Sequence, residues 1–85
     1  MTKPSKLYAS LLANSAQVIS FRDFERLLVA AGFALKRERG SHKSYRHPRV
    51  PEILTIQPRG KDAQSYQVRL FLDMMRRHAL EVEDR

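Results

Sequence analysis

The fold of this chain is decided by the stretch Arg39-Gly40-Ser41-His42-Lys43-Ser44-Tyr45-Arg46-His47. Gly40 predicts a tight turn, because glycine takes a positive φ without a steric cost. The residues after it predict a short strand, whose side chains alternate between two faces. Tyr45 is the one large and mostly apolar side chain of this strand, so we expect its face to meet the core. The opposite face then presents His42, Ser44 and Arg46 to solvent.

The segments on both sides of this strand predict an α+β fold. Ser20 followed by Asp23 is typical of a helix start, and apolar residues recur at helical spacing from there to Gly32. We expect helices over 21–31 and 64–78 and strands over 33–38, 42–47 and 53–57. The order is α-β-β-β-α, with a three-stranded antiparallel sheet. Two amphipathic helices cover one face of such a sheet and leave the other face open.

Further expectations concern the division of the chain into segments and the direction of side chains in the first strand. Residues 1–19 form an N-terminal extension with a short helix over 6–13, residues 20–80 form the domain, and residues 81–85 form an acidic tail. Within the first strand, the alternation predicts that Phe33 and Leu35 point inward.

Charge is concentrated in the middle of the chain. The net charge is +7, and the segment 36–49 carries +5 of it, because six basic residues face one acidic residue there. A basic segment on a small domain favours a polyanionic partner, most often nucleic acid. The chain has no cysteine and no continuous apolar run, so we expect a cytoplasmic protein without a disulfide or a membrane span.

The histidine beside these cations suggests RNA cleavage without a metal. An imidazole titrates near pH 6.5, so it can take a proton from a 2′-hydroxyl or give one to a leaving 5′-oxygen. Arg39, Lys43 and Arg46 can offset charge that develops at phosphorus. The second proton-transfer role is open between His47, Lys43 and water. An ordinary exposed histidine is the alternative reading of His42.

No cofactor or metal is expected. The three histidines lack metal-ligand spacing, since alternation puts His42 and His47 on opposite faces and His78 lies near the end of the last helix.

The segment from Phe24 to Leu80 resembles the HicA family of toxins, which are small ribonuclease partners of HicB antitoxins. The resemblance is carried by Leu27-Leu28, Ala31-Gly32-Phe33, Arg39-Gly40-Ser41-His42 and Tyr45-Arg46-His47-Pro48. It implies a fold like the double-stranded RNA-binding domain. It also implies that His42 is the catalytic residue of an mRNA-cleaving toxin and that a HicB-like antitoxin covers the histidine face.

Two features depart from the family pattern. Many members have a histidine after the third strand, where this chain has Pro58-Arg59-Gly60, and the extension over residues 1–19 is longer than in the compact family form. We predict RNA contacts from Arg39, Lys43, Ser44, Arg46 and Arg59. Two alternatives remain: a non-catalytic double-stranded RNA-binding module, and a protein-interaction domain with an acidic partner.

Overall fold

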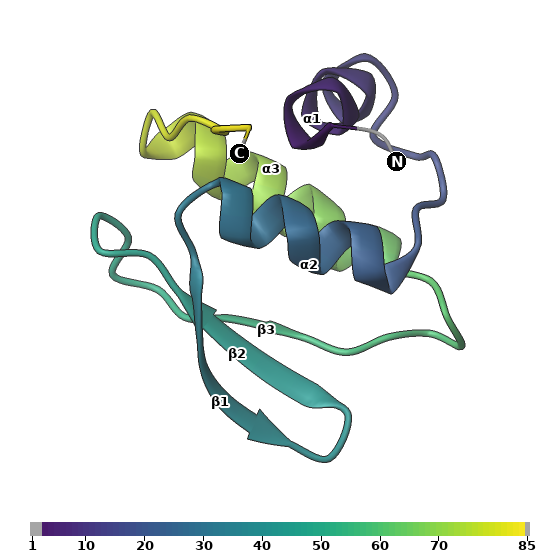
Figure 1. Cartoon of the computed structure of the whole chain (residues 1–85), viewed down its shortest axis with the longest axis vertical. Coiled ribbons are helices and arrows are strands. Elements are labelled where there is room, and N and C mark those ends of the chain that lie inside the picture. Colours follow the sequence, from purple (N-terminus) through teal and green to yellow (C-terminus); the bar gives the residue numbers. More distant parts are fainter. Residues whose placement is uncertain (1–2, 85) are drawn as a thin grey trace.

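The chain folds into three layers, seen in a computed structural model that describes residues 3–84. Its elements are α1 (Pro4–Ala13), α2 (Phe21–Ala30), β1 (Ala34–Arg39), β2 (His42–Arg46), β3 (Leu54–Ile56) and α3 (Ser65–Arg77). The sheet forms the first layer, α2 and α3 form the second, and α1 lies on the far side of that helix pair (Figure 1). Among the described residues, no helix combines the length and apolar character needed to cross a membrane.

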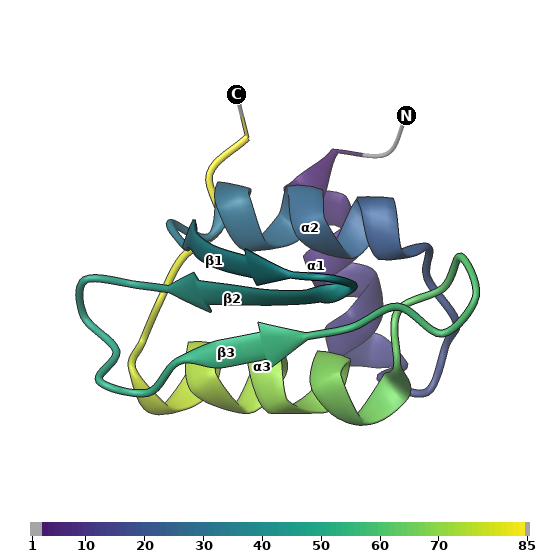
Figure 2. The ribbon, with the colours of Figure 1, turned by 90° about the horizontal axis from the view of Figure 1, so that it is seen from below.

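The sheet has the strand order β1-β2-β3 with both pairs antiparallel. Figure 2 looks onto this sheet and shows α2 and α3 behind it, so that one face carries no helix. The predicted α+β fold with the order α-β-β-β-α is therefore confirmed, and each predicted element differs from the observed one by one or two residues at its ends.

Local chemistry explains where α2 begins and how the chain turns. The Ser20 side chain accepts a hydrogen bond from the backbone N–H of Asp23 at 3.0 Å, which caps the helix. Gly32 follows the helix with φ of +97° and turns the chain toward β1. Gly40, with φ of +60°, is the first residue of the loop between β1 and β2, as a type II′ hairpin turn requires.

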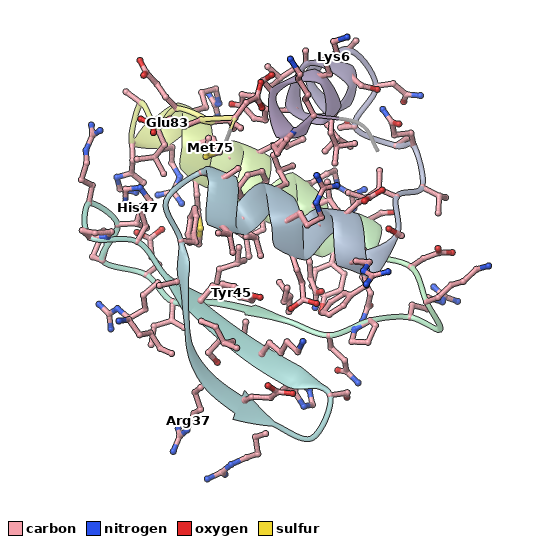
Figure 3. The ribbon with its side chains drawn as sticks, in the orientation of Figure 1. Lys6, Arg37, Tyr45, His47, Met75 and Glu83 are labelled. Atoms are coloured by element: carbon pink, nitrogen blue, oxygen red, sulfur yellow. The ribbon has the colours of Figure 1, made fainter. Side chains whose placement is uncertain are left out.

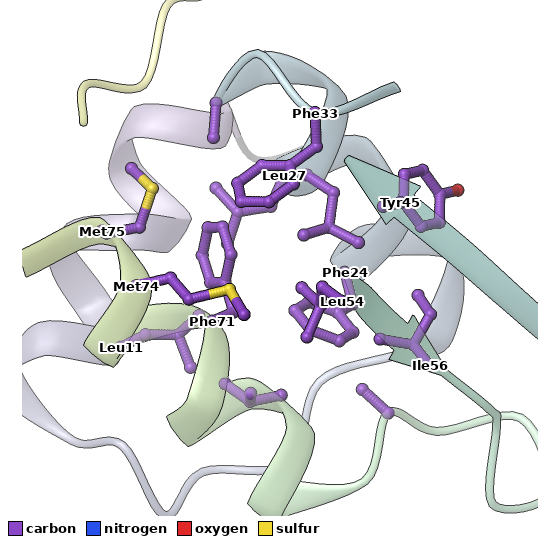
Figure 4. Packing of buried hydrophobic residues seen from close by; sticks show 14 of the residues in the cluster. Leu11, Phe24, Leu27, Phe33, Tyr45, Leu54, Ile56, Phe71, Met74 and Met75 are labelled. Atoms are coloured by element: carbon purple, nitrogen blue, oxygen red, sulfur yellow. The ribbon is translucent and has the colours of Figure 1, made fainter. Parts of the chain in front are cut away.

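The core lies between the sheet and the helices and extends to α1. Figure 4 shows the side chains of α2, α3 and the strands converging there. The largest fully buried side chains are Phe24, Phe71, Leu11, Leu27, Leu28, Leu54, Ile56, Met75 and Val68. Leu11 comes from α1, and Tyr8 of the same helix packs edge-on against Phe71 with ring centroids 6.3 Å apart. The N-terminal helix is therefore part of the core.

Leu35 pairs with Tyr45 and therefore lies on the helix-covered side of the sheet, but the expectation that it joins the core is wrong, since 44% of its surface is exposed. Phe33, just before β1, is the residue that reaches the core. The cause is the position of β1: it is an outer strand that runs away from the helices, and all six of its residues are exposed (Figure 1).

The C-terminal segment contacts the end of α2 and the start of α1. The backbone N–H of Glu83 donates to the carbonyl of Ala30 at 2.9 Å. The Asp84 carboxylate accepts hydrogen bonds from the backbone N–H and the hydroxyl of Ser5, in the first turn of α1. The division into segments 1–19, 20–80 and 81–85 stays a prediction, and these contacts link its first and last segments.

Candidate nucleic-acid interface

The first residue of β2, His42, lies at the tip of the hairpin and on the open face of the sheet. Its cross-strand partner is Arg39, the last residue of β1. Both side chains are exposed to solvent. Directly opposite side chains in an antiparallel pair stand about 5 Å apart at Cβ, so the guanidinium and the imidazole can act on one ligand.

A β-bulge gives the open face a second arginine. The register shifts between Leu35 and Arg37, so that Leu35 pairs with Tyr45 while Arg37 pairs with Ser44. Lys36 is the extra residue, and such a bulge reverses the alternation of the residues after it. Arg37 thereby shares the face of Ser44, and its side chain projects away from the helices (Figure 3).

Sequence reasoning did not place Arg37 in the site. Strict alternation from Leu35 would have turned Arg37 toward the helices. One signal was present: residues 36–39 are four consecutive charged residues, a run that fits poorly with a strand that buries every second side chain.

Ser44 lies in the middle of this face and is linked to β3. It pairs with Thr55, and the two hydroxyl oxygens are 3.1 Å apart. Ser44 is half-buried and Thr55 is exposed. The pair gives the face a polar centre that can donate or accept hydrogen bonds.

Arg46 and Arg59 lie at opposite ends of the sheet. Arg46 ends β2, and one of its guanidinium nitrogens lies 3.5 Å from the carbonyl oxygen of Pro51. Arg59 follows β3 and pairs with Asp62 in a turn around Gly60. Because Lys43 pairs with Ile56, Arg59 belongs to the same end of the sheet as His42. His42, Arg46 and Arg59 therefore extend from one end of the sheet to the other.

Lys43 is the predicted site residue that the structure separates from the others. It lies on the helix-covered face, where its ammonium donates to Glu25 Oε2 of α2 at 2.9 Å. That ammonium also lies 5.7 Å from the centroid of the Phe21 ring. The hydrogen bond from Lys43 to Glu25 raises the pKa of the lysine. Its charge is thus compensated within the fold.

Tyr45 joins the same cluster on the helix-covered face. Its hydroxyl donates to Glu25 Oε2 at 2.7 Å, and Figure 3 shows its side chain directed toward the helices. Burial and the hydrogen bond to the Glu25 carboxylate raise the pKa of Tyr45. Glu25 therefore fixes β2 to α2 through Lys43 and Tyr45. These two side chains lie on the face opposite to His42, Ser44 and Arg46.

His47 directly follows the other end of β2, and its ring makes contacts within the fold. Its ring packs against Phe33 with centroids 5.2 Å apart, and its Nδ1 accepts the backbone N–H of Arg49 at 3.0 Å. Burial lowers the pKa of His47, and the charge of Arg49 lowers it further, while a hydrogen bond to the backbone of Ala31 opposes this. About 16 Å of strand separates His47 from His42.

No group of three or more histidine, cysteine, aspartate or glutamate side chains in the described part of the chain is arranged to hold a metal ion. His78 is the residue that caps α3 at its C-terminus, and its Nε2 lies 3.5 Å from Glu52. His47 and His78 both lie beside Arg49, whereas His42 lies at the other end of β2.

These features define a small α+β domain with one histidine and several cations on an uncovered sheet face. A comparison with known protein families matches residues 21–75 to the family described as the HicA toxin of bacterial toxin–antitoxin systems. The chain therefore belongs to the HicA toxin family. Toxins of this family are ribonucleases, and membership implies an antitoxin partner. Searches of curated proteins and of solved structures gave no match.

Proposed function

We propose that this protein is the toxin of a type II toxin–antitoxin pair and that it cleaves mRNA without a metal, with His42 as the general acid or base. The observation that carries the proposal is the cross-strand pair of His42 and Arg39 on the face that no helix covers. The pair combines a group that exchanges protons near neutral pH with a permanent cation that binds phosphate bidentately.

The proposed reaction is attack by a ribose 2′-hydroxyl on the adjacent phosphorus. The bond from the 2′-oxygen to phosphorus forms as the bond from phosphorus to the 5′-oxygen breaks. A base takes the proton of the 2′-hydroxyl, and an acid gives one to the 5′-oxygen, so that the products are a 2′,3′-cyclic phosphate and a free 5′-hydroxyl. His42 performs one of these two transfers.

The positions of His47 and Lys43 favour water as the group that performs the second proton transfer. His47 lies about 16 Å farther along the strand, and its Nδ1 already accepts a hydrogen bond from Arg49. Lys43 lies on the opposite face and is paired with Glu25. Both residues therefore support the strand that carries His42 rather than reach its substrate.

The RNA ligands in this proposal follow the open face. Arg39 binds the phosphate at the cleaved bond and offsets the charge of the transition state. Arg37 and Ser44 hold the neighbouring backbone, while Arg46 and Arg59 contact RNA toward the two ends of the sheet. We assign Lys43 an indirect role through the position of β2.

The same face is the proposed surface for the antitoxin. A HicB-like antitoxin that covers His42 and Arg39 would exclude RNA directly. We expect such a partner to carry acidic side chains there, because the face presents cations.

The test is incubation of the purified protein with a structured RNA in the presence of a chelator, with analysis of the 3′ ends. Cleavage that leaves 2′,3′-cyclic phosphates supports the proposal. RNA binding without cleavage would overturn it in favour of a non-catalytic RNA-binding module. Binding of an acidic partner protein without any RNA affinity would instead favour a protein-interaction domain.

A further inference from the structure

A cleft of about 520 Å³ lies at the end of the sheet away from His42. Its walls come from the start of β1, the end of β2 and the loop that follows β2. The charged and titratable residues that line it are Lys36, Arg46, His47 and Arg49. No carboxylate lines this cleft, whereas each of four other clefts on the described surface has at least one acidic residue in its wall.

Local structure explains how the three full cations come together. Lys36 is the extra residue of the β-bulge, and it lines the cleft beside Ala34, whose cross-strand partner is Arg46. Arg49 is held by a hydrogen bond from its guanidinium to the carbonyl of His78 at 3.1 Å. Arg46 lies near the carbonyl of Pro51. None of the three takes part in the ion pairs found among residues 3–84.

The cleft is continuous with the proposed RNA surface through Arg46. This residue ends the open-face row of β2 and also lines the cleft. Four residues of strand separate it from His42, a distance of about 13 Å. Successive phosphates in one strand of a DNA duplex are about 3.4 Å apart along the axis, so this distance is on the order of a few nucleotides.

We propose that this cleft, defined by Lys36, Arg46 and Arg49, is a second phosphate-binding subsite for the RNA backbone, a few nucleotides away from the bond that is cleaved. Guanidinium groups bind phosphate oxygens bidentately, and an ammonium adds a compact charge. A phosphate bound there positions the strand along β2 and directs a remote phosphodiester to His42. This inference rests on the proposed ribonuclease function.

The test compares two lysine substitutions in a His42→Ala background, where the RNA stays intact. Lys36→Ala removes a cleft charge, and Lys6→Ala removes an exposed charge from α1, which lies on the far side of the helix layer. The affinity for a short fluorescent oligoribonucleotide is measured as a function of KCl concentration. Each lost phosphate contact lowers the slope of log affinity against log salt by about 0.7 for a single strand.

We expect Lys36→Ala to weaken binding several-fold and to lower the slope by about 0.7, while Lys6→Ala keeps the parent affinity and slope. Equal slopes and affinities for the two variants would overturn the subsite. Loss of antitoxin binding by Lys36→Ala with unchanged RNA binding would also overturn it, and would assign the cleft to the protein partner.

A parallel cleavage assay separates this inference from the proposed function. Wild-type protein that cleaves RNA, combined with equal binding by the two lysine variants, rejects the subsite and keeps the function. Wild-type protein that does not cleave RNA rejects the function, and the two salt slopes still decide whether the cleft binds phosphate.

Discussion

The hydroxyl of Tyr45 on β2 donates a hydrogen bond to the Glu25 carboxylate on α2, with 2.7 Å between the two oxygens. The same carboxylate oxygen accepts the Lys43 ammonium at 2.9 Å. One helix residue thus fixes two side chains of the strand that carries His42. Both side chains lie on the covered face of β2. The contacts with Glu25 therefore fix the strand and leave the polar groups of the open face available to a ligand.

Replacement of Tyr45 by phenylalanine tests this support. Tyr45→Phe keeps the buried ring and removes the donor to a charged acceptor, so we expect the free energy of unfolding to fall by about 1.5 kcal/mol. Urea denaturation measures the change. Tyr8→Phe is the matched control, because its ring packs on Phe71 and is retained. A Tyr45→Phe protein as stable as Tyr8→Phe would contradict the role of this hydrogen bond.

Gly32 is predicted to be less replaceable than Gly60, although both have positive φ angles. A methyl group at Gly32 would lie 2.8 Å from Nε2 of His47, whereas none of the described atoms lies within 4 Å of one at Gly60. Gly60→Ala should cost about 1 kcal/mol from its backbone conformation, and Gly32→Ala should cost more. Thermal melting compares them. Equal losses would show that His47 moves aside freely.

Stability should depend on pH through His47. Burial lowers the pKa of His47 below 6.5, so the unfolded chain binds more protons than the folded chain once the pH falls below that value. The contribution of His47 is therefore lost as the pH drops from 6.5 toward the folded-state pKa. His47→Asn keeps an acceptor for Arg49 without a titrating ring. Between pH 6.5 and the folded-state pKa of His47, we expect the urea midpoint of this variant to change less with pH than that of the wild type. Parallel plots of midpoint against pH for the two proteins would show that His47 does not cause the pH dependence.

The contact of Asp84 with Ser5 should hold the first turn of α1. Hydrogen bonds from the Ser5 hydroxyl and backbone lower the pKa of Asp84, so the carboxylate is the bound form. Asp84→Asn should speed amide hydrogen exchange at the start of α1 and leave exchange in α3 unchanged. Glu81→Gln, which removes another exposed charge of the same segment, is the control. Similar exchange in both variants would refute the contact.

Much of this arrangement could be predicted because it depends on local pattern. The Ser20 cap, the glycine turns and the apolar spacing of the two main helices each act within a few residues. The alternation after Gly40 was also sufficient to assign His42, Ser44 and Arg46 to one face.

The remaining features depend on contacts between distant segments. The bulge at Lys36 moves Arg37 to the open face, and single-strand alternation carries no information about such a shift in pairing. The partner of Lys43 is Glu25, eighteen residues earlier in the chain. Sequence reasoning placed Lys43 on the Tyr45 face but still assigned it to phosphate, because it did not include the carboxylate of α2 that compensates its charge.

The most direct test of the central claim is the single-turnover cleavage rate of His42→Ala relative to wild type on one RNA, with RNA affinity measured in parallel. We predict a rate lower by about 10²- to 10⁴-fold with nearly unchanged affinity, because a general acid or base contributes on that scale. The same variant should fail to arrest growth. A His42→Ala protein that cleaves RNA at the wild-type rate would contradict the account.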